Sequence, residues 1–272
     1  MKVFGIDFTS APSRKKPITC AHCQLKEQVL HVDYVQNLGS LNEFEVFLKS
    51  PGPWIAGFDF PFGQPHRLIK NLNWPTTWAG YVQLVATMEQ TEFESALVDY
   101  RHSQPQGDKY HLRATDITAN ALSPMMLQGV PVGKMFFKGA PRLLRAGLNI
   151  CPCHPTSDNR IALETYPALI TRAWLGKRSY KTDTPVKQTT DQQRARHELL
   201  SVLTSPSLPE TFGFTLALED SLAQALSLDP TADTLDALLC AIQAAWAYTQ
   251  PNFGIPEDCN PVEGWIVHPY SL

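Results

Sequence analysis

Three acidic residues end apolar segments, and a fourth lies within one. Asp7 ends "VFGID", Asp59 ends "WIAGFD", Glu164 ends "RIALE", and Asp236 lies in "TLDALLCAIQAAWA". An isolated carboxylate among apolar side chains costs on the order of several kcal/mol unless it is paired or bound to a metal. These segments offer no basic partner for the four acids. Because carboxylate oxygens are the ligands of hard divalent cations, the pattern predicts a metal site.

The last apolar segment reads as a helix that can lie close to a sheet. Asp236 shares one helical stripe with Cys240, Ala244 and Ala247, so that every side chain below the acid is small. Small side chains allow a helix backbone to approach closely, which would bring Asp236 over the end of the first strand. Asp233 lies one turn earlier. There the helix dipole favours any acid, so its position alone does not indicate a function.

The order of elements predicts one α/β domain over residues 1–272. Residues 1–60 predict strands, of which the first three form an antiparallel meander, and a helix capped by Ser40. Residues 66–150 predict a mostly helical insertion. The remainder predicts a strand and helix at 158–175, a helix at 191–205 and a last helix at 231–250. The expected architecture is therefore a mixed sheet with flanking helices.

Several of these segments resemble a known family. "GIDFTSAP", "GFDFPFG", "ETYPAL", "DALLCAIQAAWA" and the closing "EGWI" are similar to the DUF429 family of predicted nucleases, which is assigned to the ribonuclease-H-like fold. The resemblance covers most of the chain, including "RATD", "SP" and "PVGKM" inside the insertion. In addition, "DTLDA" resembles the D-x-x-D-A end of Holliday-junction resolvases, which have the same fold.

The resemblance implies a fold and a set of catalytic acids. By it, Asp7, Asp59 and Asp236 match the metal-binding acids, while Asp233 and Glu164 would assist them. The expected cofactor is a pair of Mg²⁺ or Mn²⁺ ions, with Asp7 bridging the two. Two such ions are the usual apparatus for in-line phosphodiester hydrolysis. The expected function is therefore metal-dependent cleavage of nucleic acid.

Basic residues in two segments are candidates for contact with a phosphate backbone. The formal net charge is −3, so nucleic-acid binding would have to depend on such local patches. In the segment "KMFFKGAPRLLR", basic residues are interleaved with Phe136 and Phe137. This pattern suits contact with phosphates and stacking on nucleobases. The alternative is a solvated loop and an amphipathic helix. The candidate substrate-binding residues are Arg14, Lys15, Arg113, Lys134, Lys138 and Arg142.

Three of these acids, and Arg113, could instead have a purely structural role. Asp7 could accept hydrogen bonds in a turn with Thr9 and Ser10, and Asp59 could cap the next turn. Glu164 could be an acid near a helix start, and Arg113 could pair with Asp116 at i,i+3.

Two other function classes stay open at this point. An ATP-dependent phosphotransferase is possible because "DFTSAP" loosely resembles a phosphate loop of sugar kinases, although no glycine pair lies near residue 236. A non-catalytic binding module on the same fold is the other.

The cysteines and the hydropathy set further expectations. "CAHC" and "CPCH" could form a zinc site, but the first lies in an expected strand and the second is a C-x-C pair, so no zinc is expected. No segment predicts a signal peptide or a membrane span, which makes the cytoplasm the expected location. Nothing in the sequence indicates an oligomeric state.

Overall fold

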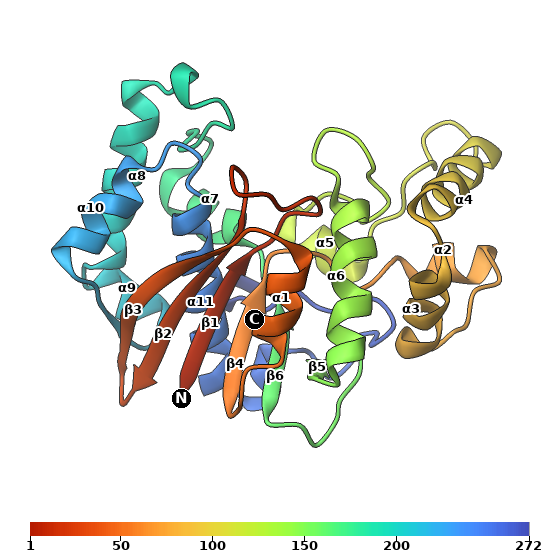
Figure 1. Cartoon of the computed structure of the whole chain (residues 1–272), viewed down its shortest axis with the longest axis horizontal. Coiled ribbons are helices and arrows are strands. Elements are labelled where there is room, and N and C mark those ends of the chain that lie inside the picture. The colour runs from red at the N-terminus through yellow and green to blue at the C-terminus, as the bar shows by residue number, and fades with distance from the viewer. Residues whose placement is uncertain (272) are drawn as a thin grey trace.

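A seven-stranded mixed sheet in the order β5-β6-β4-β1-β2-β3-β7 forms the centre of the molecule (Figure 1). The structure is a computed structural model, and it describes residues 1–271. The strands are β1 (Lys2–Asp7), β2 (Ile18–Lys26), β3 (Val29–Leu38), β4 (Trp54–Phe58), β5 (Asn149–Cys151), β6 (Arg160–Glu164) and β7 (Thr215–Ala217).

The strand directions confirm the predicted α/β fold with its antiparallel meander. Strands β1, β2 and β3 pair antiparallel, whereas β4 pairs parallel with β1 and β6 pairs parallel with β4. This arrangement is consistent with a ribonuclease-H-like fold. Because β1, β4 and β6 run in the same direction, their carboxyl ends meet at one edge of the sheet.

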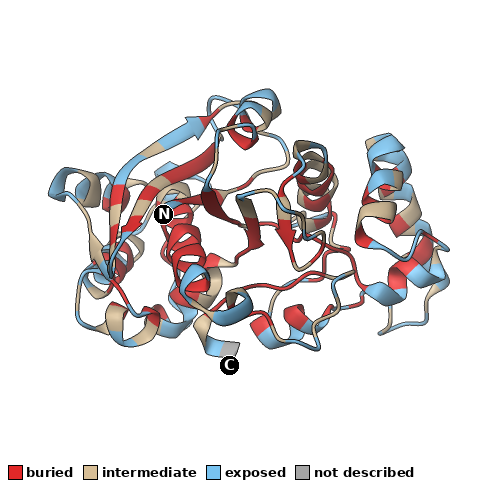
Figure 2. Ribbon diagram, turned by 90° about the horizontal axis from the view of Figure 1, so that it is seen from below, coloured by how far each residue is buried: buried red, intermediate tan, exposed pale blue. Residues whose placement is uncertain are grey.

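Helices cover both faces of the sheet (Figures 1 and 2). Helices α7 to α11 pack on one face with Val3, Ala21 and Ile55, and the helices before β5 pack on the other with Phe4 and Phe58. The helices are α1 (Leu41–Leu48), α2 (His66–Asn71), α3 (Trp78–Thr87), α4 (Gln90–Ser103), α5 (Ala114–Ala119), α6 (Val132–Ala146), α7 (Pro167–Leu175), α8 (Thr190–Leu203), α9 (Ser207–Phe212), α10 (Asp220–Leu228) and α11 (Asp233–Thr249).

Local sequence signals account for several of these boundaries. The Ser40 hydroxyl accepts from the Glu43 N–H and so caps α1, as its position predicted. Pro167 occupies the first turn of α7, where its missing N–H costs nothing. Helices α2 to α6 lie between β4 and β5 in the segment where an insertion was expected. The division of the chain into one domain with an insertion stays a prediction.

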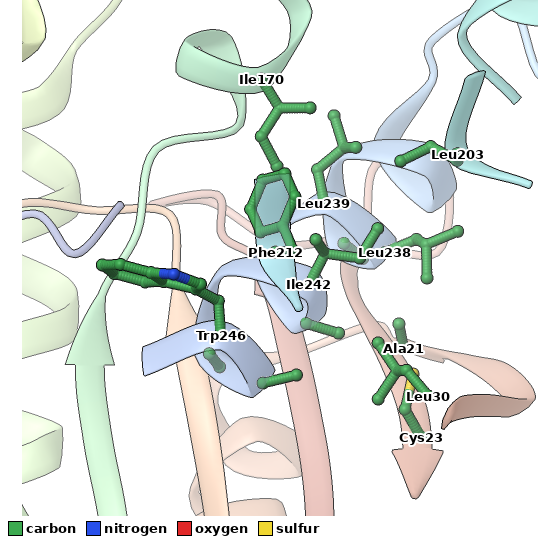
Figure 3. Packing of buried hydrophobic residues seen from close by; sticks show 14 of the residues in the cluster. Ala21, Cys23, Leu30, Ile170, Leu203, Phe212, Leu238, Leu239, Ile242 and Trp246 are labelled. Atoms are coloured by element: carbon green, nitrogen blue, oxygen red, sulfur yellow. The ribbon is translucent and has the colours of Figure 1, made fainter. Parts of the chain in front are cut away.

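Helix α11 lies unusually close to β1 and β4. Gly5 and Gly57 are register partners, and both face α11. A Cβ atom on Gly5 would come within 2.0 Å of the Ala237 carbonyl oxygen, and one on Gly57 within 2.5 Å of the Cys240 carbonyl oxygen. On its other sides α11 packs through Leu238, Leu239, Ile242 and Trp246 (Figure 3). Small residues therefore bring the helix onto the strands, as its stripe predicted.

We expect Gly5→Ala to destabilise the protein by about 1–3 kcal/mol or more, because the clash is with helix backbone rather than with a movable side chain. Gly39→Ala is the matched control, since its nearest neighbours would lie 3.7 Å away. Urea unfolding of both variants measures the difference. Equal stability of the two variants would contradict the close contact between α11 and β1.

Candidate active site

The pleat of the sheet places Asp7 and Asp59 on the face that α11 covers. Side chains alternate along a strand, so Asp7 lies on the same face as Gly5. Asp59 follows β4, two residues after Gly57, and its N–H donates to the Ile6 carbonyl oxygen at 2.9 Å. Both carboxylates are half-buried at the carboxyl ends of neighbouring parallel strands.

Asp236 reaches the same place from the first turn of α11 and is buried. Its two oxygens are both bonded. The Tyr180 hydroxyl donates to Oδ1 at 2.8 Å, and the Lys181 ammonium lies 2.5 Å from Oδ2. The Lys181 side chain is 46% exposed, whereas that of Asp236 is 1% exposed. A flexible cation therefore covers the most buried acid of the cluster from the solvent side.

Burial and mutual repulsion make the cluster electrostatically unfavourable. Burial first, and then the charges of Asp236, Asp59 and Asp233, raise the pKa of Asp7 well above its ordinary value. Burial and the charge of Asp236 likewise raise the pKa of Asp59 to about 7, although Lys181 acts in the opposite direction. Burial also raises the pKa of Asp233, with Asp229 as the next cause. The four acids are thus brought within electrostatic reach of one another.

Asp7 and Asp59 differ from ordinary structural acids. Within residues 1–271 neither carboxylate accepts a hydrogen bond from the protein. The turn with Thr9 and Ser10, and the cap after β4, therefore do not account for them. Neither carboxylate has oxygens among the buried polar atoms of residues 1–271 that lack a partner, so both are open from the solvent side and available to a bound cation.

Glu164 lies on the opposite face of the sheet. In the register of β4 and β6, Phe58 pairs with Glu164, so these two side chains lie on one face of the sheet. Asp59 and Thr165 come one residue later and lie on the other face. The Glu164 carboxylate accepts from Arg113 Nη1 at 2.8 Å and Nη2 at 2.6 Å, and from the Phe62 N–H at 2.9 Å. Burial still raises its pKa, against the effect of Arg113. Glu164 acts on Asp59 by its charge alone.

Every hydrogen-bond donor of the Arg113 guanidinium is used within the protein. It is buried, and it forms the expected i,i+3 pair with Asp116. Its Nε and Nη2 donate to Asp116, and the second N–H of Nη1 donates to the Glu263 carbonyl oxygen. Together with the bonds to Glu164, these use all five guanidinium donors. The geometry favours a bracing role for Arg113, because it has no N–H left for a phosphate.

A cavity of about 310 Å³ adjoins the acidic cluster. Asp59, Asp236 and Lys181 line one part of it. Residues between β4 and β5 also line it, and these include the apolar Leu122, Val132 and Met135. A cavity at a sheet edge, next to acids with displaced pKa values, is a candidate active site.

A protein-family model described as "Protein of unknown function (DUF429)" matches residues 5–257. The chain belongs to the DUF429 family. The match includes all four acids of the cluster as well as Glu164 and Arg113. No curated protein matches the chain, and no solved structure matches it.

The other basic candidates of this DUF429 protein lie outside the cavity wall. Arg14 and Lys15 are exposed in the loop between β1 and β2, where the adjacent Lys16 pairs with Asp183 at 3.2 Å. On α6, Lys134 pairs with Glu94 at 3.2 Å and Arg142 pairs with Glu45 at 3.0 Å. Lys138 lies 4.9 Å from the ring centroid of Phe137. These three α6 residues are turned toward α4 and α1.

The structure also shows where the cysteines of the first motif lie and how apolar the helices are. Cys20 and Cys23 pack in the cores on opposite faces of the sheet, so they do not face one common ion. In residues 1–271 no three His, Cys, Asp or Glu side chains form a ready-made metal site. Over the same residues no helix is long and apolar enough to cross a membrane.

Two important residues of the site had no sequence signal. Tyr180 and Lys181 lie in the irregular segment after α7, and neither falls in an apolar pattern. Only the structure shows that this segment folds back onto α11. By contrast, the separation of Glu164 from the cluster could have been found, because strand alternation places Leu163 and Thr165 on the face of Asp59.

Proposed function

We propose that this DUF429 protein is a divalent-metal-dependent nuclease whose acidic cluster is formed by Asp7, Asp59 and Asp236. The observation that carries the proposal is the pair of half-buried carboxylates, Asp7 and Asp59, which accept no protein hydrogen bond and repel each other and Asp236. Asp233 assists from the first turn of α11. The ribonuclease-H-like strand order supports the proposal, since it brings these acids to one edge.

The donor set fits a hard divalent cation, because it consists of carboxylate oxygens alone. Asp7, Asp59 and Asp236 would hold Mg²⁺ or Mn²⁺. Asp236 first has to be released from Lys181, which now supplies the positive charge at this carboxylate. In residues 1–271 the acids form no ready-made chelating group, and we expect the release of Asp236 to accompany metal binding.

When bound, a pair of such ions supplies an activated water and stabilises the leaving oxygen of a phosphodiester. The protein supplies the remainder of the site. Asp7 and Asp59 are held by paired strands, and Asp236 by a helix packed against them, so their backbone positions are fixed relative to one another. Lys181, the exposed cation of the site, would contact a phosphate oxygen of the substrate. Arg113 and Glu164 brace the loop after β4 through Phe62.

The direct test is cleavage of labelled single-stranded, duplex and branched oligonucleotides with Mn²⁺ or Mg²⁺. We expect cleavage that stops on addition of a chelator and returns with Mn²⁺. Asp7→Asn protein, purified in parallel, excludes a contaminating nuclease. Absence of cleavage with both ions, together with no stabilisation by Mn²⁺, contradicts the proposal. A saturable rise in melting temperature with ATP and Mg²⁺ would instead favour a phosphotransferase.

The pKa shifts predict how the metal response depends on pH. Asp7 and Asp59 bind protons more tightly in the folded than in the unfolded chain. Their contribution to stability is therefore complete below the unfolded pKa of about 3.9 and is lost as pH rises through the raised folded pKa values, about 7 for Asp59. Bound cations require the deprotonated acids and offset the repulsion. We expect Mn²⁺ to raise the melting temperature more at about pH 8 than at about pH 6.

Thermal melts across this range, with and without Mn²⁺, check the prediction. Asp59→Asn is the informative variant, because it removes one of the two titrating acids and should flatten the pH dependence. A metal response that is equal at both ends of the range would contradict a site built from Asp7 and Asp59.

A further inference from the structure

The cavity beside the acidic cluster has two chemically different parts. One group of lining residues is charged and comprises Asp59, Asp236 and Lys181 together with Arg113 and its partners Asp116 and Glu164; the other comprises apolar side chains of α6 and of the segment that precedes it. Val132 and Met135 come from the first turns of α6, and Leu122 comes from the segment after α5. A ligand that fills the cavity therefore meets both charged and apolar side chains.

The apolar part is incompletely covered by the protein. Leu122 is 46% exposed and Val130 is 54% exposed, although both line the cavity. These two apolar side chains are therefore accessible both to solvent and to a ligand that enters the cavity. Ile117, on the adjacent α5, is also exposed but does not line the cavity, so it provides a comparison.

An aromatic ring lies between the two parts. Tyr166 lines the cavity just before α7, and Arg172 holds it in place. The Arg172 guanidinium carbon lies 5.3 Å from the ring centroid, and its Nη2 donates to the Tyr166 hydroxyl at 3.0 Å. Arg172 is itself anchored by the carbonyl oxygens of Ala119 and Asn120. A fixed tyrosine ring beside an apolar wall is a surface on which a flat base can stack.

We propose that this cavity binds one unpaired nucleotide of the substrate, with its base against Leu122, Met135 and Tyr166 and its phosphate at the Lys181 end. The inference rests on the proposed nuclease function and names its substrate class. The volume of about 310 Å³ lies at the small end of ligand sites, which suits one nucleotide and is too small for a double helix. Single-stranded or terminal nucleotides are thus the expected substrates.

The charges agree with this orientation. Lys181 is the exposed cation at the acidic end, whereas Arg113, which also lines the cavity, has no free donor. The phosphate is therefore directed to the Lys181 end, next to the carboxylates that would hold the metal. The base is directed to the apolar part, where no charged side chain of α6 lines the wall.

Calorimetric titration with adenosine 5′-monophosphate and with ribose 5-phosphate, both in Mn²⁺, tests the inference. The two compounds share the phosphate and the sugar, and only the first has a base. We expect the nucleotide to bind at least about tenfold more tightly, as expected for one stacked base. Leu122→Glu should abolish this difference, whereas Ile117→Glu, an equivalent change at an exposed site outside the cavity, should preserve it.

Equal affinity of wild type for the two compounds would overturn the inference, and so would equal effects of the two variants. The wild-type comparison does not depend on the folding of any variant. Metal-dependent cleavage that Leu122→Glu leaves unchanged would contradict the nucleotide cavity but leave the nuclease function standing. Nucleotide binding that depends on Leu122, without cleavage of any oligonucleotide, would support the cavity and contradict the nuclease.

Discussion

Replacing Asp7 by Asn should abolish metal-dependent cleavage without destabilising the metal-free protein. Asn keeps the shape of the side chain but removes one of the charges that repel Asp59 and Asp236. The metal-free variant should therefore unfold at the same temperature as wild type or at a higher one. Cleavage should fall by at least about a thousandfold, since a lost metal ligand removes several kcal/mol of transition-state stabilisation.

Asp99→Asn is the matched control, because Asp99 is an exposed acid of α4 far from the cluster in the fold. It should leave cleavage, the metal-free melting temperature and the response to Mn²⁺ unchanged. The informative measurement is the melting temperature of Asp7→Asn and of Asp99→Asn, each with and without Mn²⁺. A metal-free Asp7→Asn protein that is destabilised, and that keeps the full Mn²⁺ response, would show that Asp7 is a structural acid.

Replacing Arg113 by Met should destabilise the protein by about 3–5 kcal/mol at neutral pH. The change leaves Asp116 and Glu164 buried without their counter-ion, and it also removes the bond to the Glu263 carbonyl oxygen. Glu164→Gln in the same chain should recover part of the loss, because it removes one of the two uncompensated charges. Urea unfolding of the single and double variants measures both effects.

Arg178→Met is the matched control for Arg113. Arg178 also forms a two-pronged ion pair, with Glu198 at 2.6 and 2.7 Å, but both partners are on the surface. Exposed pairs of this kind contribute little, so stability should hardly change. If both arginine variants lose equal stability, the buried network is no more important than a surface ion pair, and its bracing role is wrong.

The strand and helix pattern of the central fold could be predicted from local sequence. The meander, the Ser40 cap and the small-residue stripe of the last helix each have a short-range signal that the structure bears out. Helices α9 and α10 and strand β7 were not anticipated. Strand β7 and helix α9 are too short for a periodic signal, whereas α10 is as long and as amphipathic as α7 and could have been predicted.

The site was less predictable, since it depends on contacts between distant segments. Asp7, Asp59 and Asp236 come within electrostatic reach of one another through the pairing of β1 with β4 and the close packing of α11, of which the sequence indicated only the second. The position of Lys181 on Asp236 depends on the path of an irregular segment, which carries no periodic signal. Glu164 was grouped with the cluster because it ends a buried strand. It lines the same cavity, but strand alternation turns it to the other face of the sheet, where Arg113 is its partner.

The contact between β1 and α11 also sets the order in which the site can appear during synthesis. Asp7 is in the first strand of the chain and Asp236 is in its last α-helix, so most of the polypeptide must be made before the two can meet. Until α11 emerges from the ribosome, the strand face around Gly5 and Gly57 has no cover and the acids have no third member. Domains fold as units during translation, and contacts of long sequence separation form late. The growing chain therefore carries no complete acidic cluster until α11 has been made.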